Sequence, residues 1–597
     1  MADLCLTTVL TLPEPGAWQS VAASASWRLS SIALAGPHSL AVACGEEVVV
    51  AVLGAGGHGI AESMLGEAGA IYDDWCERGA LRRLERLVTL PVSGVIFWPR
   101  RDAVCVFRDK FGVMPWMVHA SPESGMSVTS SPERHTAATA QAPLDETWFG
   151  RFLWGIDAAS RDDCFVGSER LRAGESLWLR DGRAAYERYW CPSHSPNGSS
   201  AKDHTAQLRE ALFSAVSRIP GDLPLVFTLS GGLDSSGILA AHCSGLAPGA
   251  CADAVSLVSA RHPSCDESGE LDILERAFPI RLRRISMDGA WALAEPNLYH
   301  QCRSYGPLVA PGIETSLAVY RAMRQTHGRC RIVTGYGGNF LVKVRREALW
   351  RDLIARRAWP ELARELIHLR PHHARELLAR LMANSADGKL LEVLKRLLPA
   401  PLQQTIFRPR YAEADPQTWL CYDFVQRHGP ESVDPIFSMT HGQERDFLPV
   451  SWEWEMRARA LDWAARAGGV TQYDPLFDPE LYALCAQFPP GDFLRHGDSR
   501  HLYKEALRPL LPHAILNHPK RQSFDAIVHE GVAVRARPVV ESAIAHLPHT
   551  QAGTMIDPQA MARSYAKYAE TVAQHGEALP FRSDLLWRAI STTLWVG

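Results

Sequence analysis

The segment FTLSGGLDSSGILAA, residues 227–241, constrains the fold of this chain more than any other stretch of its sequence. An apolar run ends at Leu229, two glycines and an aspartate follow, and a second apolar run begins after Ser236. The runs predict a buried strand and then a helix, because glycine allows a tight turn and the helix N-terminus directs its free N–H groups at that turn. Such a turn is typical of a phosphate-binding site.

Single apolar runs alternate with helical segments after residue 204. Strands are predicted near 223–229, 254–259 and 330–334, and helices near 205–218, from 235, and near 267–277. This alternation predicts a parallel sheet with helices on both faces, whose ligands bind beyond the carboxyl ends of the strands. Residues 345–400 are rich in Arg, Leu, Glu and Ala at helical period, which indicates an added helical layer.

The first 190 residues follow a different pattern of short β-rich runs. Two examples are LAVACGEEVVVAVLG at 40–54 and VSGVIFWPRRDAVCVFRD at 92–109, separated by glycine, proline and polar turns. The stretch CPSHSPNGSSAKDH that follows cannot bury apolar surface or hold a regular ladder, so it predicts a linker. We therefore expect a first domain at 1–190, a linker at 191–204 and a second domain at 205–597.

Charge and side-chain content exclude several classes of protein. The net charge of -4 offers no general attraction for nucleic acid or for an anionic membrane surface. No segment approaches the roughly 18 apolar residues of a membrane span, and the start of the chain lacks a signal-peptide pattern. The 13 cysteines and 23 histidines form neither C-x-x-C nor H-E-x-x-H, so no disulfide framework or transition-metal site is expected. These features predict a cytoplasmic protein without a nucleic-acid or membrane partner.

The pattern S-G-G-x-D-S-S at 230–236 resembles the pyrophosphate loop of the asparagine synthetase superfamily, whose enzymes cleave ATP between its α and β phosphates. A structural turn of the same composition is the alternative. The resemblance implies an ATP-binding set of Leu229, Ser230, Gly231, Gly232, Asp234, Ser235, Ser236, Val258 and Gly335. Asp234 is expected to bind Mg²⁺ rather than phosphate, because a bridging metal removes the conflict between two negative groups.

The first domain resembles the glutaminase-like domain of the same superfamily. The similarity lies in CVFRDKFGVMPWMV at 105–118, in CFVGSERLRAGESLWL at 164–179 and in RYW at 188–190. It implies an Ntn-type αββα domain ahead of a doubly wound, parallel-sheet ATP pyrophosphatase domain with added helices. Glutamine-using members begin with a cysteine whose own α-amine is the base. The nearest cysteine is Cys5, so the first domain is expected to be inactive.

A second departure is VTGYGGNF at 333–340, where asparagine synthetases carry SGEGSDE. Tyr336 replaces a glutamate and resembles the tyrosine of β-lactam and carbapenam synthetases, which acts with a glutamate to take a proton from the attacking amine. Glu455 is the expected partner, because it lies shortly before YDPLFDP. The alternatives are a Tyr336 that packs at a strand end and a Glu455 on a solvated helix face. Asn339 stands at a second metal position, where an amide is a weaker Mg²⁺ ligand than a carboxylate.

The segment DSRHLYKEALRPLLPHAILNHPKRQSF, residues 498–524, resembles the C-terminal element of the superfamily. Lys520 matches a lysine that, in lactam-forming relatives, steadies the tetrahedral intermediate and the leaving AMP. Arg500 matches a second cationic position. Apart from this motif, Lys520 would be interpreted as a surface lysine.

Taken together, the chain resembles the lactam-forming branch of the superfamily, and most of all the lasso peptide cyclases. The implied reaction is ATP-dependent adenylation of an Asp or Glu side chain of a leader-trimmed linear peptide. The peptide's N-terminal amine then closes a macrolactam, releasing AMP. Implied partners are that core peptide, a leader peptidase and a leader-recognition protein. The alternatives are a β-lactam-type small-molecule synthetase, an asparagine synthetase-like amidotransferase, and a non-catalytic scaffold that binds nucleotide or peptide.

Overall fold

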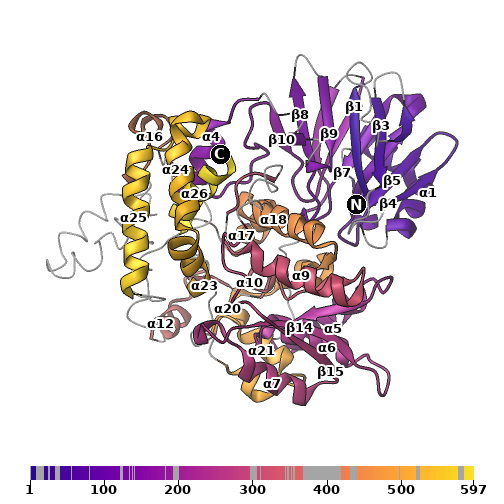
Figure 1. Ribbon diagram of the computed structural model, residues 1–597. Helices are drawn as coiled ribbons and strands as arrows, with labels where there is room; N and C mark the ends of the chain where they lie inside the picture. The colour runs from indigo at the N-terminus through magenta and orange to yellow at the C-terminus, as the bar shows by residue number, and fades with distance from the viewer. Residues whose placement is uncertain are drawn as a thin grey trace.

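In the computed structural model, the residues described below form three β-sheets, with helices packed around the third (Figure 1). It describes residues 2–596 except for 9–18, 24–26, 34–39, 55–56, 79–80, 122–124, 133–134, 137–138, 140–141, 182, 193–200, 296–304, 310, 343, 346–348, 351–352, 354–355, 368–417, 430–438, 440, 496–497, 519–524 and 576–583.

The first two sheets are antiparallel and make up the β-rich part of the chain. One has the order β10 (Ser168–Arg170), β8 (Met117–Ser121), β9 (Gly125–Thr129), β1 (Ala2–Thr8), β3 (Trp27–Ala33) and β2 (Gln19–Ala23). The other has the order β12 (Arg183–Arg188), β11 (Glu175–Arg180), β7 (Ala103–Phe107), β6 (Ser93–Trp98), β5 (Val49–Leu53) and β4 (Leu40–Cys44). The two β-rich runs singled out in the sequence form the β4–β5 and β6–β7 hairpins.

Both faces of the second sheet are buried along its central strands β5, β6, β7 and β11, which explains why those strands are apolar at nearly every position. Ala51 and Leu53 of β5 belong to a core shared with Val128 of the first sheet, whereas Val50 and Val52 face the opposite way. Helices α1 (Gly57–Arg78) and α2 (Arg82–Leu87) cover that opposite face. The described elements thus give a helix layer and two sheet layers of the expected αββα arrangement; an outer helical layer is not among them.

The third sheet is parallel, as predicted. Its order is β15 (Ile280–Ser286), β14 (Ala252–Val258), β13 (Leu225–Thr228), β16 (Arg331–Val333) and β17 (Thr471–Tyr473). The chain adds strands on one side of β13 and then returns to add strands on the other. The carboxyl end of β13 is therefore a topological switch point, where doubly wound sheets bind their ligands.

Helices flank this sheet, and the three that the sequence predicted, α5 (Ala201–Ser217), α6 (Leu233–Cys243) and α7 (Ser268–Ala277), are among them. Others are α9 (Ile313–His327), α18 (Trp452–Gly468) and α21 (His501–Leu507). Helix α5 begins at Ala201, so the last four residues of the predicted linker are helical. Of the predicted helical layer at 345–400, the structure describes α12 (Trp359–Ile367), and residues 368–400 lie outside the described part of the chain.

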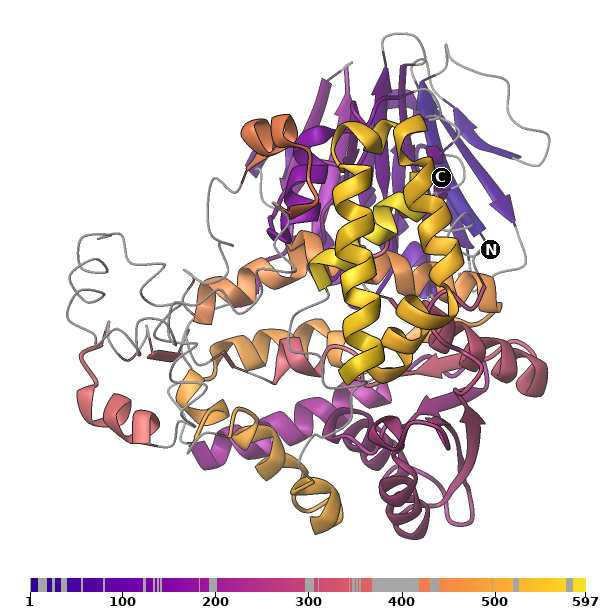
Figure 2. The ribbon, with the colours of Figure 1, turned by 60° about the vertical axis from the view of Figure 1, so that its left-hand side comes forward.

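The C-terminal helices α24 (Arg537–His546), α25 (Pro558–His575) and α26 (Asp584–Val596) form a group that reaches from the parallel sheet toward the antiparallel sheets (Figure 2). Helix α26 packs against α4 (Glu146–Trp154) of the β-rich part. Within the described residues, no helix combines the length and the apolar character that crossing a membrane requires.

A continuous apolar core crosses the boundary between the β-rich part and the parallel-sheet part. Phe111 follows β7, and its ring contacts Phe477 and Tyr482 of the second domain at centroid distances of 5.2 and 5.3 Å. All three residues belong to one buried cluster. The contact between the domains therefore resembles the inside of a single domain more than a wet, mobile interface.

Candidate active site

The glycine turn follows β13 and leads into α6, as the sequence predicted. Gly231 has φ +56°, and a Cβ on it would lie 2.5 Å from the Cβ of Glu270. Both the left-handed backbone conformation and the lack of space therefore exclude a larger residue at this position. The hydroxyls of Ser230 and Ser235 lie 3.2 Å apart across the turn. Ser236 is fully buried behind them, and its hydroxyl has no hydrogen-bond partner among the described residues. The turn thus presents backbone N–H groups and two hydroxyls at the open end of the sheet.

A second turn, after β16, packs directly against the first. A Cβ on Gly335 would lie 2.6 Å from the backbone nitrogen of Ser235, and one on Gly338 would lie 2.2 Å from Cγ of Asp234. Glycine is therefore required at Gly335 by the close approach of two backbones, and at Gly338 by the close approach of the Asp234 carboxylate. This contact brings Tyr336 and Asn339 to the phosphate turn.

Both turns line one cavity of about 760 Å³. Its wall includes these predicted site residues: Leu229, Ser230, Gly231, Gly232, Asp234, Ser235, Gly335, Tyr336, Asn339 and Arg500. Val258 was expected here, but the wall on β14 is made by Val255, Ser256 and Leu257, because the strand reaches the cavity before its last residue. Lys520 lies outside the described residues, so its place in the site stays a prediction.

Arg500 stands between the two expected metal ligands. Its Nη1 lies 2.9 Å from each carboxylate oxygen of Asp234, and its Nη2 donates to the amide oxygen of Asn339. The guanidinium therefore forms hydrogen bonds with the oxygens that were expected to bind Mg²⁺. Among the described residues, no group of three or more His, Cys, Asp and Glu could hold a metal ion.

One carboxylate and one amide oxygen fit Mg²⁺ only in part. Proteins usually bind Mg²⁺ of a nucleotide through one or two carboxylates together with phosphate oxygens and water. Asp234 and Asn339 match that requirement for a metal that enters with the nucleotide. They do not match a cation held by protein alone.

Tyr336 sits in an aromatic cluster at the cavity wall. Its ring stacks on Trp454 at 5.6 Å with an angle of 23° between the planes, and Phe340 and Phe477 flank it. Burial raises the pKa of Tyr336 to about 12, although the positive charge of Arg457 acts to lower it. The phenol is therefore neutral at physiological pH, and Arg457 is the group that would stabilise its ionised form.

The predicted pairing of Tyr336 with Glu455 is wrong in this structure. Oε2 of Glu455 lies 2.7 Å from Nη1 of Arg108, a buried residue of the first domain. The carboxylate on the Tyr336 side of α18 is instead Glu453, which lies 2.8 Å from Nη2 of Arg457. Glu455 is also not on a solvated helix face, because it is buried.

A half-buried carboxylate that the sequence reasoning missed lies close to Tyr336. Asp474 accepts hydrogen bonds from Thr334 and from Nε2 of Gln472, and the hydroxyl of Thr334 in turn accepts the backbone N–H of Tyr336. Burial raises the pKa of Asp474 to about 6 despite these hydrogen bonds. The signal lies in YDPLFDP, the motif that marks the region after Glu455 and also contains Asp474. Asp474 fixes the start of the second turn.

Cys5 lies in the interior of β1, where its backbone is paired with Ser30 on one side and Thr129 on the other. A residue in the middle of a sheet strand is bonded to neighbours at both ends and has no free α-amine. The expected inactivity of the first domain stays a prediction.

These features define an α/β protein with a phosphate-type turn at the switch point of a parallel sheet. A family model described as asparagine synthase matches residues 207–596, and the chain belongs to that family.

Relatives in Mycobacterium tuberculosis and Mycobacterium bovis are named as candidate glutamine-hydrolysing asparagine synthetases. Each is 28% identical over 117 residues, which is 19% of this chain. The match spans less than a fifth, 18%, of each relative's length.

Two solved structures are also similar in part. One is a glutamine phosphoribosylpyrophosphate amidotransferase from B. subtilis, with 10% identity and a TM-score of 0.18, covering 57% of this chain and 86% of that one. The other is titled as the allosteric regulatory enzyme of purine biosynthesis, with 10% identity and a TM-score of 0.19, covering 55% and 82%. At these TM-scores neither likeness bears on the fold or on the site.

Proposed function

We propose that this protein is an ATP-dependent ligase that activates a carboxylate by adenylation and captures it with an amine. The observation that carries the proposal is that the phosphate turn and Tyr336 line the same cavity. One end of the cavity can thus hold the nucleotide while the other acts on the attacking amine. Membership in the asparagine synthase family supports the coarse class, an amide-forming ligase that uses ATP.

In the first step, a carboxylate oxygen of the substrate attacks the α-phosphorus of ATP, and pyrophosphate leaves. The N–H groups of the turn and the hydroxyls of Ser230 and Ser235 would hold the departing phosphates. Asp234 and Asn339 would hold Mg²⁺, which neutralises phosphate charge when it is bound.

In the second step, the amine nitrogen attacks the acyl carbon, and AMP leaves as the amide forms. The amine must lose a proton, and Tyr336 is the polar group of the aromatic cluster that faces the cavity. A phenol with a pKa of about 12 is a poor base by itself. The charge of Arg457 reduces the cost of forming phenolate, so the working unit is Tyr336 with Arg457 and Glu453 rather than Tyr336 with Glu455.

Within this class we propose macrolactam closure of a linear peptide, as in a lasso peptide cyclase, with a leader peptidase and a leader-recognition protein as partners. Internal capture needs no ammonia, so this proposal goes together with the expectation that the first domain is inactive. A β-lactam-type synthetase or an asparagine synthetase-like amidotransferase would use the same first step. The non-catalytic scaffold is the remaining alternative, because Asn339 weakens the metal site.

The test is exchange of labelled pyrophosphate into ATP, together with the mass of the product, for a panel of linear peptides, small amino acids and aspartate with ammonium. Peptide-dependent exchange and a product lighter by one water support the proposal. If only small amino acids support pyrophosphate exchange, the substrate is a small molecule and not a peptide. If no substrate supports pyrophosphate exchange, the protein is the non-catalytic scaffold. Tyr336→Phe should slow product formation more than exchange, whereas Tyr565→Phe, a buried tyrosine in α25, should change neither.

A further inference from the structure

A turn of the first domain, residues 108–114, is held rigid from inside by Arg108. This residue is completely buried and donates to three backbone carbonyls: those of Gly112 at 2.5 Å, Met114 at 2.6 Å and Leu171 at 2.6 Å. A guanidinium in that position fixes the path of the turn, because moving the turn would leave several buried donors unsatisfied.

Asp109 fixes the same turn from the other side. Its carboxylate accepts hydrogen bonds from the backbone N–H groups of Phe111, Val113 and Met114, at 3.0 to 3.2 Å. The turn therefore has one set conformation, although no catalytic role in the first domain accounts for it.

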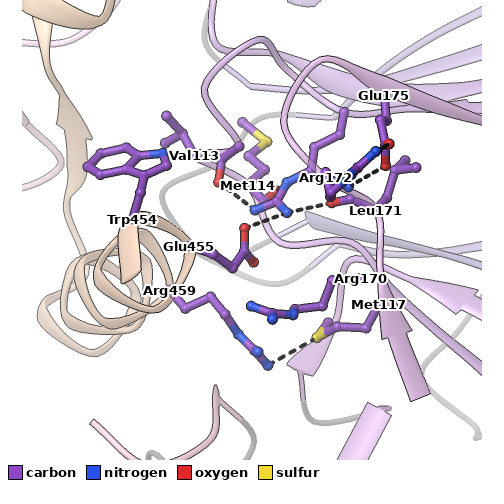
Figure 3. A network of polar contacts seen from close by, with 12 residues as sticks. Val113, Met114, Met117, Arg170, Leu171, Arg172, Glu175, Trp454, Glu455 and Arg459 are labelled. Atoms are coloured by element: carbon purple, nitrogen blue, oxygen red, sulfur yellow. Dashed lines mark hydrogen bonds and ion pairs between the residues drawn. The ribbon is translucent and has the colours of Figure 1, made fainter. Parts of the chain in front are cut away.

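The turn touches helix α18 of the second domain at two consecutive residues. Nε1 of Trp454 donates to the carbonyl oxygen of Phe111 at 2.5 Å, and Glu455 forms its ion pair with Arg108. Figure 3 shows both side chains leaving α18 toward the first domain, with Glu455 pointing toward the segment of Leu171 and Trp454 lying beside Val113.

Trp454 is also the residue on which Tyr336 stacks. Its ring is buried and lies 4.4 Å from that of Phe477 and 5.5 Å from that of Phe340, so little space remains for it to turn. An uninterrupted path of contacts thus runs from the 108–114 turn, through Trp454, to the phenol at the cavity wall.

We infer that the first domain serves the amide-forming step as a positioning element: its 108–114 turn fixes Trp454 and Glu455 of α18 and thereby the orientation of Tyr336. The inference rests on the proposed function for the identity of that step. Trp454 and Glu455 are positioning residues, because neither is among the residues that line the cavity.

A buried charge cluster gives the contact its register. Arg459, one turn after Glu455 on α18, lies 3.2 Å from Asp163 of the first domain, and the Arg170 side chain lies opposite (Figure 3). Sliding α18 along the first domain would separate these charges in a place where water cannot replace them. The helix therefore has one position in which both Glu455 and Arg459 are paired.

The test uses Trp454→Phe, which keeps an aromatic ring against Tyr336 and removes the N–H that the Phe111 carbonyl accepts. Trp452→Phe is the matched control. It lies on the same helix, is equally buried and packs against Trp148 at 5.4 Å, and its Nε1 has no hydrogen-bond partner among the described residues.

Two readouts are compared at equal thermal stability of the variants. In hydrogen–deuterium exchange, Trp454→Phe should speed exchange of residues 334–341, and Trp452→Phe should not. With a peptide substrate, Trp454→Phe should lower product formation by roughly ten-fold or more while pyrophosphate exchange changes by less than about three-fold. Glu455→Gln, which keeps the shape and removes the charge facing Arg108, should give the same pattern.

Equal hydrogen–deuterium exchange of residues 334–341 in the two tryptophan variants would refute the inference. Product formation by Trp454→Phe at the rate of Trp452→Phe would refute it as well. Failure of the proposed function looks different. In that case the unmodified protein shows neither pyrophosphate exchange nor product with any substrate, and the hydrogen–deuterium comparison still decides the role of the turn.

Discussion

Arg500 gives the sharpest test of how this site handles a metal. The guanidinium lies between Asp234 and Asn339, so a divalent cation must displace it to reach both oxygens. We expect the nucleotide-free protein to bind Mn²⁺, used as a probe for Mg²⁺, only weakly. Arg500→Ala should bind Mn²⁺ more tightly, because it removes the competing cation and keeps both ligands.

The size of the effect follows from the geometry. Arg500 donates to both carboxylate oxygens of Asp234 at 2.9 Å, and the two side chains are 14% and 21% exposed. Hydrogen bonds to charged groups contribute about 1.5 to 3 kcal/mol net, and partial exposure favours the lower half of that range. At about 1.4 kcal/mol per factor of ten, removing the guanidinium should tighten Mn²⁺ binding by roughly ten- to thirty-fold.

The assay is titration of Mn²⁺ by electron paramagnetic resonance without nucleotide. Lys504→Ala is the control, since it removes one positive charge from the same cavity but from a lysine that pairs with Asp498 at 2.7 Å. It should tighten binding far less. If Arg500→Ala and Lys504→Ala bind Mn²⁺ equally well, net charge rather than the place of the guanidinium governs the site, and the reasoning fails.

Three further predictions follow. The folded pKa of Asp474, about 6, exceeds the usual 3.8, so its contribution to stability is full below about pH 4, declines up to about pH 6, and is constant above that. The decline in the free energy of unfolding amounts to about 3 kcal/mol at most. Measured by urea unfolding, the free energy of unfolding of Asp474→Asn should depend less on pH between about pH 4 and 6 than that of the parent. An unchanged dependence would contradict the assigned pKa. Lys520→Ala should lower amide formation by about 10² to 10³-fold, and cyclisation at the parental rate would make Lys520 a surface residue. Glutamate release from glutamine should be undetectable, and a release that Cys5→Ala abolishes would restore the first domain as a glutaminase.

The main elements of the second domain could be read from the sequence because their signals are local. Apolar runs predicted β13, β14 and β16, and glycine turns follow β13 and β16. The close approach at Gly231 and Gly335 explains why those two turns need glycine. Strand β15, Ile280–Ser286, was missed because four arginines or serines interrupt its apolar positions. It is the edge of the sheet, where charged side chains keep another strand from pairing.

The sequence determined the phosphate turn, the parallel sheet and the presence of Tyr336 at its edge, because each depends on residues close together in the chain. The tertiary structure alone decided which carboxylate of α18 lies near Tyr336. Each residue of a helix is rotated by about 100°, so Glu453 and Glu455 point in nearly opposite directions, and nearness to YDPLFDP could not distinguish them. Because α18 packs against the first domain, Glu453 and Arg457 lie on the side of Tyr336, and Glu455 forms an ion pair with Arg108. Such a choice depends on contacts between residues more than 300 positions apart, which no local pattern records.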